Sequence, residues 1–139
     1  MEYKRYDDKI VLRLDKGDEI TESVIKVAEK ENIGAGSVSG IGATDDFTVG
    51  VFDINKSDYE KYSYCGNHEI TALIGNITTM HNKPYVHLHL TAAGKSGKTV
   101  GGHLIKAIIS LTAEIVISVI PAVIDRKRNE ELKINTLVF

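Results

Sequence analysis

The sequence contains little cysteine and no long apolar run, and each absence excludes a class of protein. Its single cysteine, Cys65, excludes an intrachain disulfide and a zinc site built from several cysteines, and it fits a reducing compartment. Because no stretch of about eighteen apolar residues and no basic-then-apolar leader occurs, we expect neither a membrane span nor a signal peptide. We therefore expect a cytoplasmic protein in which any metal ligands are histidines and carboxylates.

An excess of positive charge is also absent. The chain of 139 residues has 17 Lys and Arg against 19 Asp and Glu, a net charge of −2, which argues against a protein whose main role is to neutralise phosphates. In the one basic cluster, DRKRNEELK, Arg126 and its two basic neighbours are followed at once by Glu130 and Glu131. We predict a solvent-exposed turn of mixed charge there rather than a nucleic-acid surface. With no repeat or linker composition either, one domain over residues 1–139 is expected.

One amphipathic helix is predicted at about residues 18–32. Asp18 is a favourable N-cap, and Asn32 and Gly34 are typical of the end of a helix. Apolar residues recur between them at i, i+4, i+7 and i+8, which places them on one helical face. These residues are Ile20, Val24, Val27 and Ala28.

Most of the remaining chain has strand patterns. DKIVLRL alternates, and later segments such as DFTVGVFD, EITALIGNITT, PYVHLHLTAA and AEIVISVI are short and β-branched, with Asp, Asn, Gly or Pro between them. HLIKAIISL at 103–111 is compatible with helix or strand, and we favour extended structure. One helix with about six strands predicts an α+β domain whose sheet is mainly antiparallel, because parallel strands need further crossover helices.

Two of the predicted strands, ITALIG at 70–75 and IVISVI at 115–120, are apolar on both faces. One helix covers only one side of a sheet, so the second apolar face needs another cover. Another subunit would provide it, and a sandwich-like fold within the monomer would bury the same residues. Both interpretations stay open at this point.

Three of the five histidines lie in YVHLHLTAAGKSGKTVGGHL at 85–104. His87 and His89 share one strand face, while the apolar residues between and beside them face the core. The glycine-rich segment that follows allows the chain to reverse and bring His103 back to the same end of the sheet. Three imidazoles with an open fourth position match a catalytic type of zinc site. We predict that His87, His89 and His103 bind zinc or another divalent transition metal; two polar side chains on a solvated sheet face are the alternative.

Three other polar groups are candidates for chemistry. Glu114 lies among apolar strand residues, so we expect it at a sheet edge or beside a histidine or a metal-bound water. Cys65 and His68 have a possible ligand spacing but no orienting third group, so we expect a half-buried thiol and a turn histidine. His81 is expected in a turn. Glu114 is therefore the candidate catalytic residue, as the base of a zinc-dependent hydrolase-like enzyme acting on a small-molecule substrate.

The histidine segment and its surroundings resemble a known domain. VHLHLTAAGKSGKTVGGHLIKAIISLTAEIVISVI, preceded by GDEITESVIKVAEKENIGAGSVSGIGA, is similar to the plants-and-prokaryotes conserved (PPC) domain over nearly the whole chain. The H-x-H strand, the G-G-H-L step and the T-A-E strand start are the most specific parts. The resemblance implies an α+β subunit that assembles as a homotrimer. It also implies that His87, His89 and His103 hold a metal ion, zinc in the first instance.

The same resemblance connects the chain to DNA only indirectly. In plants the domain follows an AT-hook, and the AT-hook enters the minor groove; here no R-G-R-P core occurs and we expect no additional DNA-binding module. A net charge of −2 gives direct DNA binding no support. Three functions remain open: a homotrimeric, regulatory metal-binding module that works through a small ligand or a protein partner, a zinc-dependent hydrolase-like enzyme, and DNA binding in its own right.

Overall fold

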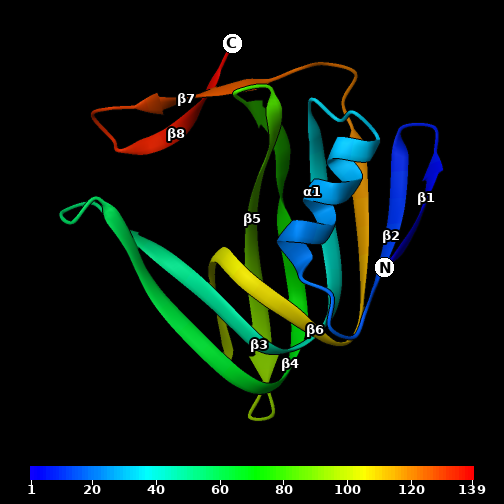
Figure 1. Cartoon of the computed structure of the whole chain (residues 1–139). Coiled ribbons are helices and arrows are strands. Elements are labelled where there is room, and N and C mark those ends of the chain that lie inside the picture. The colour runs from blue at the N-terminus through cyan, green and yellow to red at the C-terminus, as the bar shows by residue number, and fades with distance from the viewer.

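The computed structural model describes all residues, 1–139, as eight strands and one helix (Figure 1). The α+β class, the mainly antiparallel sheet and the single prominent helix are confirmed. The helix α1 has 11 residues, too few to span a lipid bilayer. The elements in chain order are β1 (Glu2–Tyr6), β2 (Lys9–Asp15), α1 (Ile20–Lys30), β3 (Gly36–Asp53), β4 (Asp58–Met80), β5 (Lys83–Gly94), β6 (Thr99–Val119), β7 (Asp125–Asn129) and β8 (Ile134–Val138).

Four strands of the sheet close on themselves. The strand order is β1-β2-β6-β3-β4-β7-β8, and β5 pairs with both β4 and β6, so that β6, β3, β4 and β5 form a ring. All of these pairings are antiparallel, and β4 with β7 is the one parallel contact. Register shifts in β3 between Gly40 and Gly42 and between Thr44 and Asp46 mark bulges, which bend a strand. The long β3–β4 hairpin accordingly swings away from the body of the sheet (Figure 1).

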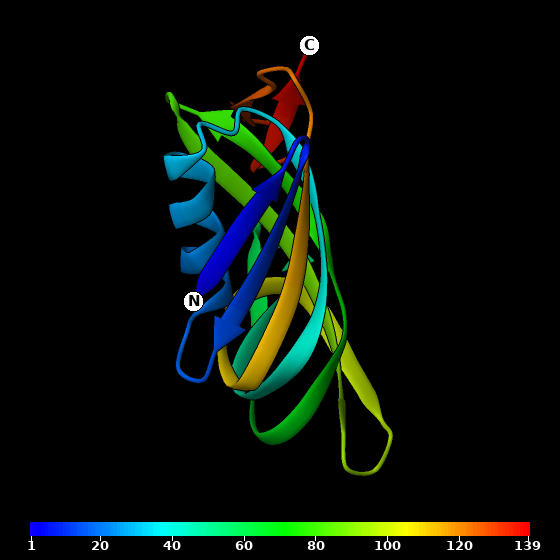
Figure 2. The same cartoon turned by 90° about the vertical axis from the view of Figure 1, so that its right-hand side faces the viewer.

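The helix α1 lies where its apolar spacing predicts and covers one face of the sheet (Figure 2). It begins at Ile20 rather than at residue 18, because Glu19 is the N-cap: its Oε2 accepts from the Glu22 backbone N–H at 2.7 Å. The predicted cap, Asp18, instead accepts from the backbone N–H of Asp15 at 2.8 Å and stabilises the preceding turn. The four predicted apolar helix residues are all buried: Ile20, Val24, Val27 and Ala28.

The ambiguous segment 103–111 is extended, as predicted, and forms part of β6. The prediction of a solvent-exposed turn at 125–133 is wrong in part. Residues 125–129 and 134–138 form the β7–β8 hairpin, and Arg126 is 7% exposed. The charge pattern fails there because long-range contacts to β4 and β8, rather than local polarity, decide where the Arg126 side chain lies.

The two segments that are apolar on both faces, 70–75 and 115–120, each have one buried and one exposed face. Ile115 and Ile117 are fully buried and Val116 is exposed; likewise Leu73 is buried and Ile74 is 59% exposed. A sandwich within the chain does not cover the second face, since the ring of strands turns only one side of β3, β4 and β6 toward α1 and the core. In Figure 2 no element lies over the opposite side.

Candidate metal centre

A tight hairpin of β5 and β6 brings the three predicted histidines together. His87 and His89 lie on β5, and His89 is the register partner of His103 on β6. The chain reverses through a turn in which Gly97 has φ +75°, a conformation that glycine adopts without strain. A Cβ on Gly101 would lie 2.6 Å from the Leu90 carbonyl oxygen, so the strands can approach this closely only with glycine there.

The three imidazoles face a common centre. Their potential ligand atoms all lie within 4.8 Å of one another, and the ring centroids are 5.0–5.6 Å apart. The Nε2 atoms of His87 and His89 are 3.3 Å apart. Two nitrogens bound to one tetrahedral zinc at about 2.0–2.1 Å lie about 3.3 Å from each other, so this spacing fits a shared ion.

The surroundings of His87 and His103 favour the neutral form of these two histidines. Burial, and then the proximity of His87 and His89, lowers the pKa of His103 to about 4. Burial, followed by His89 and Arg126, also lowers the pKa of His87. Neutral imidazoles keep the nitrogen lone pair that a metal ion requires. In addition, Nδ1 of His103 is buried without a hydrogen-bond partner. A buried polar atom of this kind is costly unless something binds it, so the donor set and its environment fit a divalent cation.

The aromatic ring of Tyr59 orients His103. The two rings are stacked, with centroids 4.7 Å apart and an interplanar angle of 24°. Tyr59 comes from the end of the β3–β4 hairpin, and a Cβ on Gly50 of β3 would lie 2.9 Å from its ring. Nothing in the sequence around Tyr59 points to this role, because its contact with His103 depends on how the hairpin bends.

His87 and His103 open into a cleft of about 320 Å³ between the β3–β4 and β7–β8 hairpins. His87, His103 and Tyr59 line one part of it, and Arg126 and Arg128 of β7 line another. The basic cluster that the sequence suggested was a solvated turn is therefore part of the wall of the candidate site. The one feature of the sequence that pointed to this role of the basic cluster was its concentration of positive charge.

The structure does not bring Glu114 to the histidines. Glu114 lies on β6 in register with Arg13 of β2 and Ile41 of β3, so it is not at a sheet edge, and it is exposed. Within one chain the expected histidine or metal partner of Glu114 is therefore absent. Because Glu114 is exposed, its carboxylate stays hydrated, and this explains why it is tolerated among apolar strand residues.

The remaining candidates also lie outside the cluster. Cys65 is exposed rather than half-buried. His68 lies on β4 rather than in a turn, and its ring packs edge-on against Phe47 with centroids 5.1 Å apart. His81 occupies the turn between β4 and β5, as predicted.

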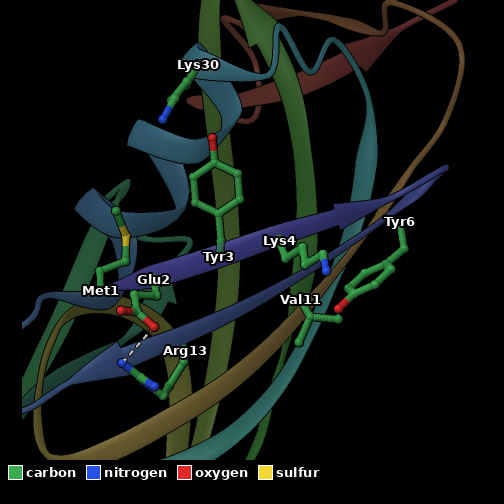
Figure 3. Close-up of a pocket in the computed structure, with 8 residues that line it drawn as sticks. All are labelled: Met1, Glu2, Tyr3, Lys4, Tyr6, Val11, Arg13 and Lys30. Atoms are coloured by element: carbon green, nitrogen blue, oxygen red, sulfur yellow. Dashed lines mark ion pairs between the residues drawn. The ribbon is translucent and has the colours of Figure 1, made fainter.

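A larger hollow, of about 720 Å³, lies beside β1, β2 and α1 (Figure 3). Its polar groups include Tyr3, Lys30 and the ion pair of Glu2 with Arg13, whose nitrogen and oxygen are 3.1 Å apart. It contains no histidine or cysteine and is broadly open to solvent. Size alone thus does not identify a site, and the smaller cleft with the three imidazoles has the more distinctive chemistry.

The chain is similar to several known proteins. Residues 1–121 match the family model of the Plants and Prokaryotes Conserved (PCC) domain. The bifunctional protein GlmU of Synechococcus sp. (strain JA-3-3Ab) is 34% identical over 109 residues, which are 77% of this chain but 16% of that protein. The chain thus spans a small part of this curated relative, and the matched part is no guide to the activities of the whole.

Several solved structures, including one from Bacteroides thetaiotaomicron and one from Archaeoglobus fulgidus, are similar to this chain over nearly their full length. A protein of Bacteroides thetaiotaomicron described as a "putative DNA binding protein" superposes with a TM-score of 0.96 at 29% identity, covering 99% of this chain and 96% of that one. A metal-containing protein of Archaeoglobus fulgidus superposes with a TM-score of 0.87 at 28% identity, covering 99% and 97%.

Proposed function

Because the chain belongs to the Plants and Prokaryotes Conserved domain family, we propose that it is a homotrimeric metal-binding module. In this proposal His87, His89 and His103 hold one divalent transition metal ion, with zinc as the first candidate. The observation that carries it is the convergence of three imidazoles within 4.8 Å, one of which has a buried nitrogen without a partner. The metal-containing relative from Archaeoglobus fulgidus adds support.

The protein's own residues would prepare the site. The β5–β6 ladder sets the separation of His89 and His103, and the stacked ring of Tyr59 limits rotation of the His103 imidazole. Burial keeps His103 neutral near pH 7, so its lone pair is available without loss of a proton. An ion held by the three imidazoles would act there as a Lewis acid toward a small ligand.

The homotrimer is proposed from the exposed apolar face of the sheet. Ile41, Ile74 and Leu111 are 57%, 59% and 72% exposed, and they lie on neighbouring strands β3, β4 and β6. Ile41 and Leu111 line one shallow hollow, and Ile41 and Ile74 line the adjoining one, so the three form a continuous patch. Apolar patches of this kind mark interaction sites, and additional copies of the same chain would cover it.

The ligand of the module is proposed to be a small molecule or a protein partner rather than DNA. The chain has a net charge of −2, and Arg126 and Arg128 line a cleft rather than a flat exposed surface. The structural relative described as DNA-binding leaves DNA as the competing possibility. Retention on nonspecific duplex at low salt that disappears steeply as salt rises would support DNA binding instead.

Metal analysis tests the proposal. The protein is purified without added metal, and its metal content is measured by mass spectrometry for wild type, His89→Ala and His81→Ala. We expect metal in the wild type and in His81→Ala, since His81 lies in the β4–β5 turn, and its loss in His89→Ala. Equal metal content in the wild type and in His89→Ala contradicts the proposed site.

A further inference from the structure

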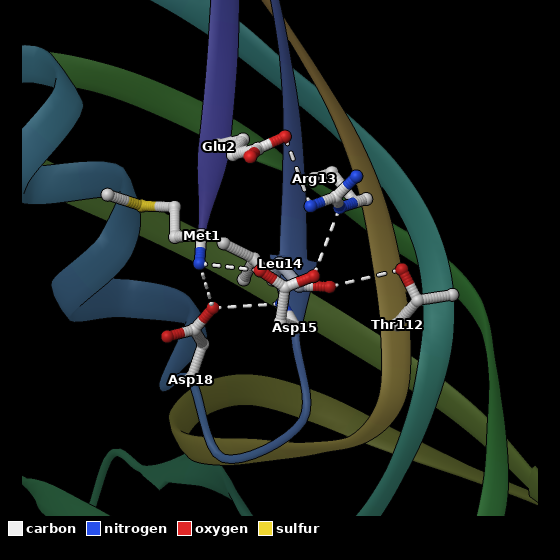
Figure 4. A network of polar contacts seen from close by, with 7 residues as sticks. All are labelled: Met1, Glu2, Arg13, Leu14, Asp15, Asp18 and Thr112. Carbon is white, nitrogen blue, oxygen red and sulfur yellow. Dashed lines mark hydrogen bonds and ion pairs between the residues drawn. The ribbon is translucent and has the colours of Figure 1, made fainter.

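Arg126 is a buried cation without an anionic partner. Its residue is 7% exposed, and no carboxylate oxygen lies within 4.0 Å of its guanidinium. The arginines on the opposite side of the molecule differ. Arg5 pairs with Glu31. Arg13 pairs with Asp15 and Glu2, as Figure 4 shows. A desolvated charge is costly when no group of opposite sign compensates it. The burial of the Arg126 guanidinium without a carboxylate partner therefore needs a physical reason.

Neutral groups hold the Arg126 guanidinium in place. Its Nε donates to the Thr78 hydroxyl at 2.8 Å, one terminal nitrogen donates to the Asn135 carbonyl at 2.9 Å, and the other donates to the Asn76 side-chain oxygen at 3.0 Å. Its Cζ lies 4.9 Å from the centroid of the Tyr85 ring. A guanidinium has five N–H groups, so two remain for a ligand after these three bonds. The side chain is thus rigidly oriented and its charge is uncompensated.

The cleft beside the histidines has a predominance of positive charge. Arg126, Arg128 and Lys133 line it. Lys133 pairs with Glu130 at 3.3 Å, whereas Arg128, like Arg126, has no carboxylate within 4.0 Å. Asp58 is its one lining carboxylate; it is exposed and its Oδ1 accepts from the Tyr59 backbone N–H at 2.7 Å. The volume of about 320 Å³ suits a small molecule.

We propose that this cleft binds a small anion bearing a carboxylate or a phosphate group, with the anionic group on Arg126 and the rest of the molecule toward His87 and His103. A planar guanidinium with two free N–H groups matches both kinds of anion. The orientation toward the histidines rests on the proposed metal site, but the pairing with Arg126 does not require a metal. The family match ends at residue 121, so the hairpin that carries Arg126 lies outside it.

Two probes test the cleft without the metal. Chelator-treated, ¹⁵N-labelled protein is titrated with malonate and, separately, with inorganic phosphate at constant ionic strength, and the Arg126 Nε–H signal and the His103 backbone amide are followed. We expect saturable shifts of both signals with at least one probe. Arg126→Met is expected to weaken binding about tenfold or more, as for loss of a charge-assisted hydrogen bond. Arg13→Met is the matched control, because Arg13 already has carboxylate partners on the far edge of the sheet.

Arg128→Met is a second variant that tests the cleft if Arg126→Met fails to fold. Arg128 is exposed and lines the same cleft, so Arg128→Met is expected to keep the wild-type melting temperature and to weaken binding severalfold. The absence of saturable shifts with both probes, or equal affinity in the wild type and in both cleft variants, overturns the inference. Anion binding in a protein that takes up no metal contradicts the metal proposal alone, whereas metal uptake without anion binding contradicts the anion site alone.

Discussion

His89 and His103 lie opposite each other on one rung of the β5–β6 ladder, with ring centroids 5.6 Å apart. Their separation is therefore set by backbone hydrogen bonding and not by flexible side-chain reach. His87 joins them from two residues earlier on the same face of β5. Changes in the backbone of this small region should consequently affect all three imidazoles.

Gly75→Ala is expected to disturb the histidine strand. Gly75 pairs with Leu88 on β5, and a Cβ there would overlap the backbone carbonyl oxygen of His87. Because backbone must move to relieve this contact, we expect a loss of stability of about 1–3 kcal/mol and a lower metal content. Thermal melting and elemental analysis measure both quantities. Lys95→Ala in the exposed β5–β6 turn is the control and should change neither; wild-type values for Gly75→Ala would contradict the proposed packing.

Tyr59→Ala is expected to weaken metal binding through loss of the stack on His103. An aromatic pair contributes about 0.5–1.5 kcal/mol, so the affinity for zinc in a chelator competition should fall about threefold to tenfold. Tyr59→Phe keeps the ring and should bind as the wild type does. Tyr62→Ala removes an exposed ring from the same hairpin and serves as the control. An affinity unchanged in Tyr59→Ala would show that the stack does not orient the ligand.

Glu31→Gln is expected to reduce stability in a pH-dependent way. Hydrogen bonds from Arg5, and then from the Tyr3 hydroxyl, lower the pKa of Glu31 below its usual 4.5 in the folded protein. The contribution of Glu31 to stability is thus present above about pH 4.5 and is lost as the pH falls through the lowered folded-state value. The difference in melting temperature between the wild type and Glu31→Gln should therefore be largest near pH 7 and shrink toward pH 3.

The control for this prediction is Glu29→Gln, which lies in the last turn of α1 two residues before Glu31 and is exposed. It lacks the two hydrogen bonds of Glu31, so its melting temperature should follow that of the wild type across the pH range. A gap for Glu31→Gln that stays constant down to pH 3 would mean that ionisation of Glu31 does not hold β1 against the end of α1.

Leu111→Glu is expected to break the proposed trimer. It places a charge on the exposed apolar patch of β3, β4 and β6, where burial against another copy would desolvate it. Light scattering after size-exclusion chromatography should give three times the chain mass for the wild type and a lower mass for Leu111→Glu. Ile54→Glu, in the β3–β4 turn and 83% exposed, should leave the mass unchanged. A monomeric wild type would refute the trimer, and a trimeric Leu111→Glu would place the interface elsewhere.

Much of the fold follows from short-range patterns in the sequence. The spacing from Ile20 to Ala28 predicts α1 because a helix repeats every 3.6 residues, and the alternation around His87 and His89 places both on one face because a strand repeats every two. The position of His103 also follows, since glycines allow the tight β5–β6 hairpin that returns it to the same rung. The N-cap was harder to predict, because Glu19 and Asp18 both have capping carboxylates and only the tertiary contact of Glu19 with the Ala107 backbone N–H distinguishes them.

The sequence alone thus determined the helix, the strands and the convergence of three histidines, because each depends on residues near one another in the chain. Tertiary structure decided what surrounds them. Arg126 is buried against Thr78 and Asn76 of a strand far earlier in the chain, and Tyr59 reaches His103 only because the β3–β4 hairpin bends. Desolvation and contact across long sequence separations depend on how the ring of strands closes, and no local pattern of polarity or spacing encodes that closure.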